Sequence, residues 1–188
     1  QAAKRAAALV HELWQRRAKV THTCGLHVHI DVRGITDERK KEFFTWARKT
    51  EGVWFALMPP SRRDNIYVKP ISGETDIPRL HYCWAHVTSY HTIEIRLHGG
   101  SINPYKITGW IEALRFLQEK IWDATHVFPT EGTPEEMFSD VRSVARLDGQ
   151  ILVETEMQTY QRDPASHPGA RSPEQILADL HGQHALAD

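Results

Sequence analysis

Apolar residues recur at the spacing of an amphipathic helix in three parts of the chain. The pattern predicts a first helix over residues 2–18 and a second from residue 36 or 37 to about 57, if it continues past Gly52. A third helix is expected from residue 104 to about 123, with Asn103 as its N-cap. The apolar stripes are Leu9, Val10, Leu13 and Trp14; Phe43, Phe44, Ala47, Trp54 and Leu57; and Ile107, Trp110, Ile111, Leu114, Leu117 and Ile121.

Alternation of polar and apolar residues predicts three β-strands between these helices. The first is expected over residues 22–32, and the other two over 82–87 and 92–97. The second and third strands are separated by a short polar segment, so we expect them to form a hairpin that turns through Ser89 and Tyr90. Helices and an antiparallel sheet together predict an α+β fold.

The pattern weakens in the last third of the chain. Residues 1–128 carry the elements above and are expected to form one domain, and residues 129–188 a helical C-terminal extension. Within the extension a helix is expected from residue 133 to about 147. A linker near 162–172, rich in proline, glycine and serine, precedes a last helix.

Composition places the chain among ordinary globular proteins. It has 188 residues, of which 40% are hydrophobic and 25% charged. A formal net charge of −1 with scattered basic residues argues against nucleic acid as a partner. Apolar runs are only a few residues long, so neither a membrane span nor a signal sequence is predicted, and we expect a cytoplasmic protein with Cys24 and Cys83 reduced. Because the chain starts at Gln1 and enters a helix at once, we expect a processed or truncated piece.

Two of the predicted strands carry the residues of chemical interest. On the first, His27 and His29 share a face with Asp31. On the last, Glu94 and Arg96 share one face. Imidazole and carboxylate groups bind divalent metals, and the planar guanidinium binds phosphate oxygens in pairs. The two strands together therefore predict a site for a metal ion and a phosphate chain.

Three motifs in order resemble one known family. They are residues 24–29 (CGLHVH), 59–67 (PPSRRDNIY) and 92–104 (TIEIRLHGGSINP), followed by an aromatic-rich helix. Over residues 5–125 the chain resembles the amidoligase family, which is grouped with glutamine synthetase and gamma-glutamylcysteine synthetase among carboxylate–amine ligases. The resemblance implies a curved antiparallel sheet with helices on its outer face and the active site on its concave face.

The resemblance also implies a reaction and a set of roles. In such ligases ATP phosphorylates a carboxylate, and an amine then displaces the phosphate to form an amide. By resemblance His27 and Glu94 bind Mg²⁺ or Mn²⁺, His29 faces the nucleotide phosphates, and Arg96 holds the phosphate in transfer. Arg62 or Arg63 supplies a second anion contact. The substrates would be a small-molecule or peptide carboxylate and an amine.

One part of the family pattern does not occur in the chain. The family's metal site also uses a Glu-x-Glu strand upstream of the His-x-His strand, and the only acid before His27 is Glu12, within a predicted helix. We therefore expect a separate chain or an upstream segment to supply that strand, or else Asp31, Glu74 or Asp76 to replace it. The alternative is a catalytically inactive scaffold or assembly protein that keeps the ligase fold.

Other interpretations of the same residues remain open. His27 and His29 could join Cys24 and His22 in a zinc site, although this spacing is unusual for structural zinc. The Glu94 and Arg96 pair could instead be an ion pair on a solvated face. Four tryptophans are expected in the core, namely Trp46, Trp54, Trp110 and Trp122, whereas Trp84 fits either the core or a nucleotide-stacking position.

Overall fold

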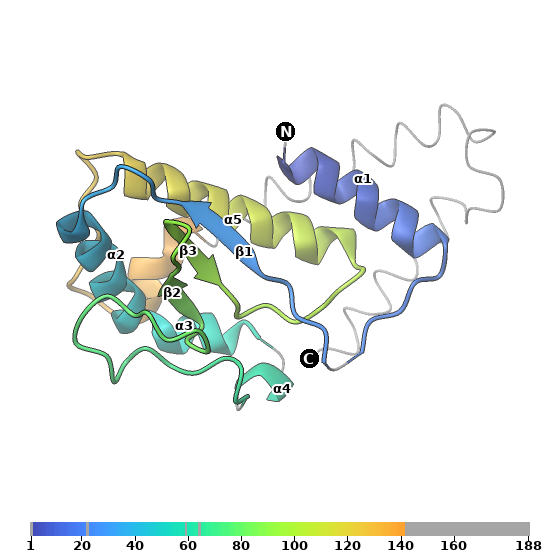
Figure 1. Cartoon of the computed structure of the whole chain (residues 1–188), viewed down its shortest axis with the longest axis horizontal. Coiled ribbons are helices and arrows are strands. Elements are labelled where there is room, and N and C mark those ends of the chain that lie inside the picture. Colours follow the sequence, from blue (N-terminus) through green and yellow to red (C-terminus); the bar gives the residue numbers. More distant parts are fainter. Residues whose placement is uncertain (1, 22, 59, 64, 142–188) are drawn as a thin grey trace.

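The protein is described by a computed structural model that covers residues 2–21, 23–58, 60–63 and 65–141 (Figure 1). Within these residues the fold is α+β, with helices surrounding one small antiparallel sheet. The named helices are α1 (Ala2–Gln15), α2 (Asp37–Lys49), α3 (Glu51–Ala56), α4 (Pro60–Arg63) and α5 (Pro104–Trp122). The strands are β1 (Val28–Asp31), β2 (Ala85–Val87) and β3 (Thr92–Ile95).

The capping residues explain where two of the long helices begin. Thr36 accepts a hydrogen bond from the Arg39 amide at the start of α2, and the Asn103 side chain accepts from two amides at the start of α5. Both starts confirm the predictions. The second predicted helix is divided, because α2 ends at Lys49 and α3 begins two residues later. The first helix ends at Gln15, three residues earlier than predicted.

The three strands pair in the order β1-β3-β2, with both pairs antiparallel. The hairpin between β2 and β3 confirms the prediction, although its strands are shorter than the alternating segments. The first strand is also shorter than the predicted 22–32. Upstream of β1 the pairing is reduced to an isolated bridge between Gly25 and Gly99.

One face of the sheet contributes to the hydrophobic core. Ile30, Ile93 and Ile95 lie on this face and are buried with aromatic residues of the surrounding helices. In Figure 1, α5 runs along the sheet and α1 lies beside the N-terminal half of α5. Trp54 is at the centre of an aromatic cluster, and its partners are Trp46, Trp84, Trp110 and Phe138. The opposite face of the sheet is left for polar side chains.

Arg39, on α2, binds the C-terminal end of α5. Its guanidinium donates hydrogen bonds to four backbone carbonyls there, at 2.5–3.1 Å. These carbonyls have no partner within the helix, and a cation also complements the negative end of the helix dipole. The carbonyls belong to Lys120, Ile121, Asp123 and His126.

The predicted C-terminal extension is described only as far as residue 141. Residues 134–141 are helical, and Thr133 and Glu136 form a capping box at the start. Met137 and Phe138 are buried in the same core as the sheet, and the Met137 carbonyl accepts a hydrogen bond from the Trp46 indole. The predicted linker near 162–172 and the last helix lie outside the described residues.

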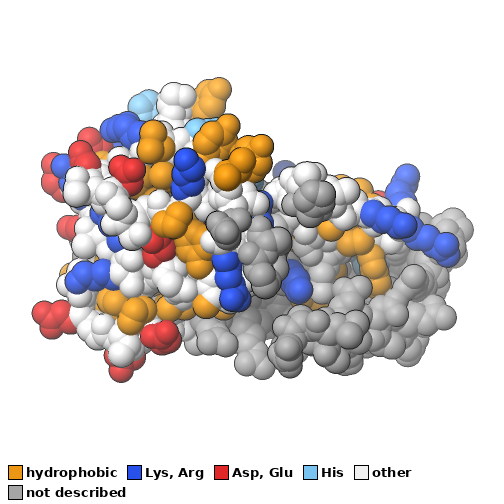
Figure 2. Space-filling model, turned by 90° about the horizontal axis from the view of Figure 1, so that it is seen from below, with side chains coloured by type: hydrophobic (Ala, Val, Ile, Leu, Met, Phe, Trp, Pro, Cys, Tyr) orange, Lys and Arg blue, Asp and Glu red, His pale blue; other side chains and the backbone are white. Residues whose placement is uncertain are grey.

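The surface of the described residues mixes charged and apolar side chains. On the face that Figure 2 shows, Lys and Arg side chains are dispersed among acidic and apolar ones. Within the same part of the chain, no helix has both the length and the apolar character needed to cross a bilayer. Cys24 and Cys83 are both free thiols, as predicted.

Candidate functional site

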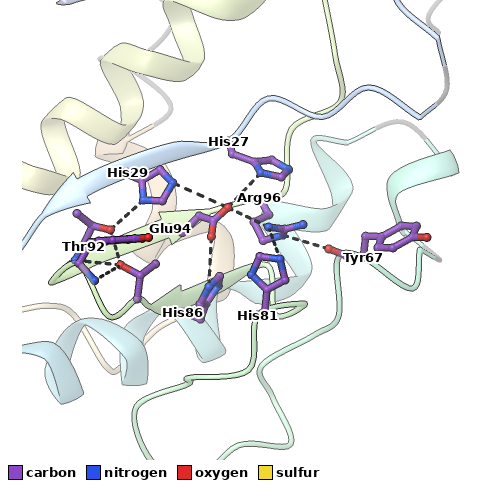
Figure 3. A network of polar contacts seen from close by, with 10 residues as sticks. His27, His29, Tyr67, His81, His86, Thr92, Glu94 and Arg96 are labelled. Atoms are coloured by element: carbon purple, nitrogen blue, oxygen red, sulfur yellow. Dashed lines mark hydrogen bonds and ion pairs between the residues drawn. The ribbon is translucent and has the colours of Figure 1, made fainter.

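A row of polar side chains crosses the sheet on the face opposite the core (Figure 3). Residues opposite each other in antiparallel strands share a face, and Glu94 on β3 pairs with His29 on β1 and with His86 on β2. Their neighbours along the strands face the core, for example Ile93 and Ile95. The alternation of the sequence therefore produces a histidine–carboxylate–histidine row across all three strands.

The carboxylate of Glu94 is the centre of the site. Its Oε1 accepts a hydrogen bond from Arg96 Nη1 at 2.9 Å and lies 3.1 Å from His27 Nδ1 and 4.0 Å from His29 Nε2. Its Oε2 lies 3.3 Å from His86 Nε2. Each oxygen therefore has its own set of neighbours. His27, directly before β1, and Glu94, on β3, do approach each other, as the alternation of polar and apolar residues predicts.

Threonines at the end of the hairpin fix the orientation of His29. The His29 Nδ1 atom lies 2.9 Å from the Thr92 hydroxyl, which in turn lies 2.8 Å from the Thr88 hydroxyl. This chain of hydrogen bonds leaves Nε2 as the ring nitrogen that faces Glu94 (Figure 3). A ring held at one nitrogen presents the other in a defined direction.

Arg96 is more enclosed than a side chain on a solvated face would be. Only 9% of its side chain is exposed, and besides Glu94 it contacts the Tyr67 carbonyl and His81 Nε2, each at 3.4 Å. The arginine therefore links β3 to the loop that carries Tyr67 and to the segment that precedes β2 (Figure 3).

Burial keeps the two histidines nearest the carboxylate neutral at pH 7. It lowers the pKa of His27, as does the positive charge of Arg96, and Glu94 opposes the change. Burial also lowers the pKa of His86, again against the pull of Glu94. The Nδ1 atom of His86 is buried without a hydrogen bond of good geometry, although the Cys83 backbone near it favours the protonated ring. Neutral imidazole is the form that binds metals.

Arg62 and Arg63 bind backbone carbonyls in this structure. Arg62 is buried and donates hydrogen bonds to three successive carbonyls, those of Arg96, Leu97 and His98, at 2.9–3.3 Å. Its guanidinium passes so close to Gly25 that a side chain there would collide with it. Arg63 donates to the Met58 and Ala56 carbonyls at the end of α3. Their roles as anion contacts stay predictions.

Several other candidate ligands are not brought into the cluster. Asp31 is bound to Arg33, which lowers the pKa of its carboxyl to about 2, and Asp76 is exposed beside Lys41. Cys24, His27 and His29 do not converge closely enough to hold one ion, so the zinc set is wrong for its described members, and His22 lies outside the described residues. Trp84 is fully buried and its indole donates to Glu51, which places it in the core.

The structure adds two histidines that the sequence patterns did not indicate. His81, His86 and Glu94 have ligand atoms within 4.8 Å of one another, and they are the only such trio among the described residues. His86 lies on a predicted strand, but the sequence did not show that its partner on the neighbouring strand is Glu94. His81 precedes the strand and gave no periodic signal. The donor set of the face is one carboxylate surrounded by imidazoles.

The stability of the protein should decrease as the pH falls below 6.5. Burial lowers the pKa of His98 from its ordinary 6.5, and the hydrogen bond to the Gly99 carbonyl offsets only part of this. Between the pKa of His98 in the folded protein and 6.5, the unfolded chain binds a proton at His98 that the folded chain does not. The contribution of neutral, buried His98 to stability is therefore complete above pH 6.5 and is lost as the pH falls through the pKa of His98 in the folded protein. Denaturant unfolding at about pH 7.5 and about pH 5.5 measures the difference.

His98→Phe is the matched variant for this test, because it keeps a ring beside Trp110 and removes the titration. Its unfolding free energy should depend less on pH than that of the parent chain. An NMR titration that places the His98 pKa at or above 6.5 would contradict the prediction.

No family model, curated protein or solved structure matches the chain in the comparisons with known proteins.

Proposed function

We propose that the chain is an ATP-dependent carboxylate–amine ligase, or part of one, with its reactive face on the polar side of the sheet. One observation carries the proposal. His27 and His29 from one motif and Arg96 from another, about 70 residues away, all surround the carboxylate of Glu94. These are the positions to which the resemblance gives metal-binding and phosphate-binding roles. The glutamine synthetase-like fold is part of the same proposal.

The donor atoms on the Oε1 side fit the ion of a metal–ATP complex. His27 Nδ1 and Glu94 Oε1 lie 3.1 Å apart and offer one nitrogen and one oxygen. Mg²⁺ in nucleotide sites commonly takes one or two carboxylates and completes its shell with water and phosphate oxygens, and Mn²⁺ accepts imidazole as well. Bound there, the metal and nucleotide would supply charge neutralisation and the phosphoryl group.

Arg96 and His29 would position the phosphate. The bond from Arg96 Nη1 to Glu94 fixes the guanidinium in one plane, and a planar fork can hold two phosphate oxygens. His29 is held by Thr92 with its Nε2 toward the same carboxylate. Donors fixed before the reaction stabilise the charge that moves in phosphoryl transfer.

The proposed reaction has two steps. A carboxylate oxygen of the acid attacks the γ-phosphorus of ATP, and ADP leaves with the formation of an acyl phosphate. The amine nitrogen then attacks the acyl carbon, inorganic phosphate leaves, and the nitrogen gives up one proton. The imidazole of His29, which lies on this face, is placed to accept that proton.

A second candidate is the inactive scaffold that keeps the ligase fold. It is favoured by the contacts of Arg62 and Arg63, whose guanidinium groups are already bound to backbone carbonyls. In this case Glu94 and Arg96 would serve as a buried structural pair.

Hydroxamate formation distinguishes the two candidates. Hydroxylamine traps acyl phosphates, so the chain is incubated with ATP, Mg²⁺ or Mn²⁺, hydroxylamine and a panel of amino acids, dicarboxylic acids and peptides. A ligase releases ADP and hydroxamate in equal amounts. Arg96→Lys keeps the charge but removes the fork, and it should lower the rate by roughly 10²–10³-fold, the usual effect of losing one preorganised donor.

His91→Asn is the control, because His91 is exposed at the hairpin turn and asparagine tolerates its positive φ of 57°. Melting curves show whether each variant is folded. ATP-dependent hydroxamate formation that is equal in Arg96→Lys and the parent chain contradicts the role of Arg96. If no acid in the panel yields hydroxamate, the proposal that this chain is an active ligase by itself fails and the scaffold is favoured.

A further inference from the structure

The two oxygens of Glu94 face different groups. Oε1 is surrounded by Arg96, His27 and His29, which are the residues of the proposed nucleotide side. Oε2 faces His86, and His81 lies next to it. The ligase roles use neither His81 nor His86, so the Oε2 side is a separate arrangement with its own chemistry.

The Oε2 side has the geometry of a three-ligand metal site. The ligand atoms of His81, His86 and Glu94 lie within 4.8 Å of one another. Ligands about 2.1 Å from one tetrahedral ion are about 3.4 Å apart, so small side-chain rotations would close the remaining distance. The two imidazole rings are 5.7 Å apart and nearly perpendicular, at 82°. Their nitrogens can therefore approach an ion from different directions.

We propose that His81, His86 and Glu94 Oε2 form a binding site for one zinc-like transition-metal ion. Two imidazoles and a carboxylate suit Zn²⁺ and its neighbours in the first transition row, whereas Mg²⁺ prefers oxygen ligands. Three protein ligands leave a fourth position for water or substrate, which is the pattern of catalytic rather than structural zinc. Binding of this ion requires neither ATP nor ligase activity, although the site shares Glu94 with the proposed nucleotide side.

The surroundings of the trio support a metal site over an ordinary hydrogen bond between histidine and glutamate. Ligating side chains are usually held by a second set of contacts, and Arg96 provides one by binding the other oxygen of Glu94. His86 is buried, with 3% of its surface exposed, and the backbone of Cys83 lies near its ring.

Access to the site is through His81, which is exposed. Its ring packs beside Tyr82, which forms an edge-to-face pair with Tyr67. Both tyrosines are exposed, so the open side of the metal site is bordered by aromatic surface. An ion can enter from this side.

The positive charge of Arg96 opposes the ion, since Nη1 lies 3.4 Å from His81 Nε2. Glutamine in its place would keep a hydrogen-bond donor for Glu94 and remove the charge, so Arg96→Gln should tighten metal binding. The same replacement should lower ligase activity, because the proposed phosphate contact is lost. Arg96→Gln thus moves the two properties in opposite directions, which separates this inference from the proposed function.

Titration of the full chain with Co²⁺ tests the site, since the visible absorption of Co²⁺ reports its coordination. We expect one tetrahedral Co²⁺ per chain, displaced by Zn²⁺ and unaffected by excess Mg²⁺. His81→Gln and His86→Gln should each weaken binding by more than the roughly 10–100-fold that loss of an outer contact costs. His81 is exposed, so its variant is expected to fold even if the buried His86 variant does not.

His91→Asn is the control at the hairpin turn and should keep the Co²⁺ spectrum and affinity. In His27→Ala, which changes the other side of the carboxylate, the tetrahedral Co²⁺ bound by His81 and His86 should remain. The proposal is overturned if His81→Gln binds Co²⁺ as tightly as the parent chain, or if His27→Ala abolishes binding. Weaker binding in Arg96→Gln would also count against it.

Discussion

Replacement of Glu94 by alanine should lower the free energy of unfolding by about 3–5 kcal/mol, the usual cost of removing one partner of a buried ion pair. Glu94 is only 5% exposed, and its carboxylate neutralises the buried guanidinium of Arg96. Without it, a positive charge is left in a site that burial has already made poorly solvated. Denaturant unfolding at about pH 8, where histidines are neutral, measures the loss.

The double variant Glu94→Leu/Arg96→Met is the control for this interpretation. It removes both charges and fills the site with apolar groups, so it should be less destabilised than Glu94→Ala. If the unfolding free energy of Glu94→Ala instead stays within about 1 kcal/mol of that of the parent chain, the Glu94–Arg96 pair behaves as a solvent-exposed ion pair and the prediction is wrong.

Trp54→Ala should cost about 3–5 kcal/mol of unfolding free energy. The side chain is 1% exposed, and four aromatic rings surround it at centroid distances of 4.6–6.1 Å. Truncation leaves a cavity that rings from α2, α5 and residues 134–141 cannot fill without moving. Thermal and denaturant unfolding both report the change.

Trp122 provides a matched control on the surface, so the prediction that placed it in the core is wrong. It is 48% exposed, and its indole donates one hydrogen bond to the Asp31 carbonyl. Trp122→Ala should therefore cost about 1 kcal/mol. Equal losses in the two variants would mean that the aromatic cluster around Trp54 contributes no more than a surface residue.

The helices could be predicted from the sequence because their signals are local. Thr36 and Asn103 are short polar residues that bind the first amides of a helix whatever the rest of the chain does. The strand over 22–32 was predicted too long because alternation cannot show where the partner strand ends. Near Gly25 only a single bridge to Gly99 remains, so residues 23–27 do not form a continuous strand with β1.

The candidate site could be predicted in part for the same reason. Alternation placed His27, His29, Glu94 and Arg96 on polar faces, but it could not show that His86 lies opposite Glu94. That pairing depends on the length of the hairpin loop. A two-residue loop at Ser89 and Tyr90 would have placed His86 on the other face, because a shift of one residue reverses every side chain.

The loop between β2 and β3 is one residue longer than a two-residue loop, since the Thr88 amide donates a hydrogen bond to the Thr92 carbonyl. His91 adopts a positive φ of 57° to close it. This conformation is common for glycine and uncommon for histidine, so the residue type gave no signal of the turn. The register of the hairpin depends on this conformation of His91, which the sequence does not predict. The alignment of His29, Glu94 and His86 across the sheet depends on the same register.

Arg62 illustrates a different limit. Its residue type predicts an anion contact, but the same fork of donors also fits backbone carbonyls, and the structure places three of them around it. Whether Arg62 binds an anion or backbone carbonyls depends on which backbone lies beside it. The carbonyls that it binds belong to residues 34–36 positions later in the chain, so the local sequence does not predict them.

The bonds of Arg39 to the end of α5 also constrain the order in which the fold can assemble. Each bond joins residues 81–87 positions apart, so the cap forms only after a long stretch of chain has been closed into a loop. Until α2 docks, the last turn of α5 has unpaired carbonyls and frays. The two helices therefore belong to one cooperative unit in local unfolding, in which the opening of α2 releases the end of α5.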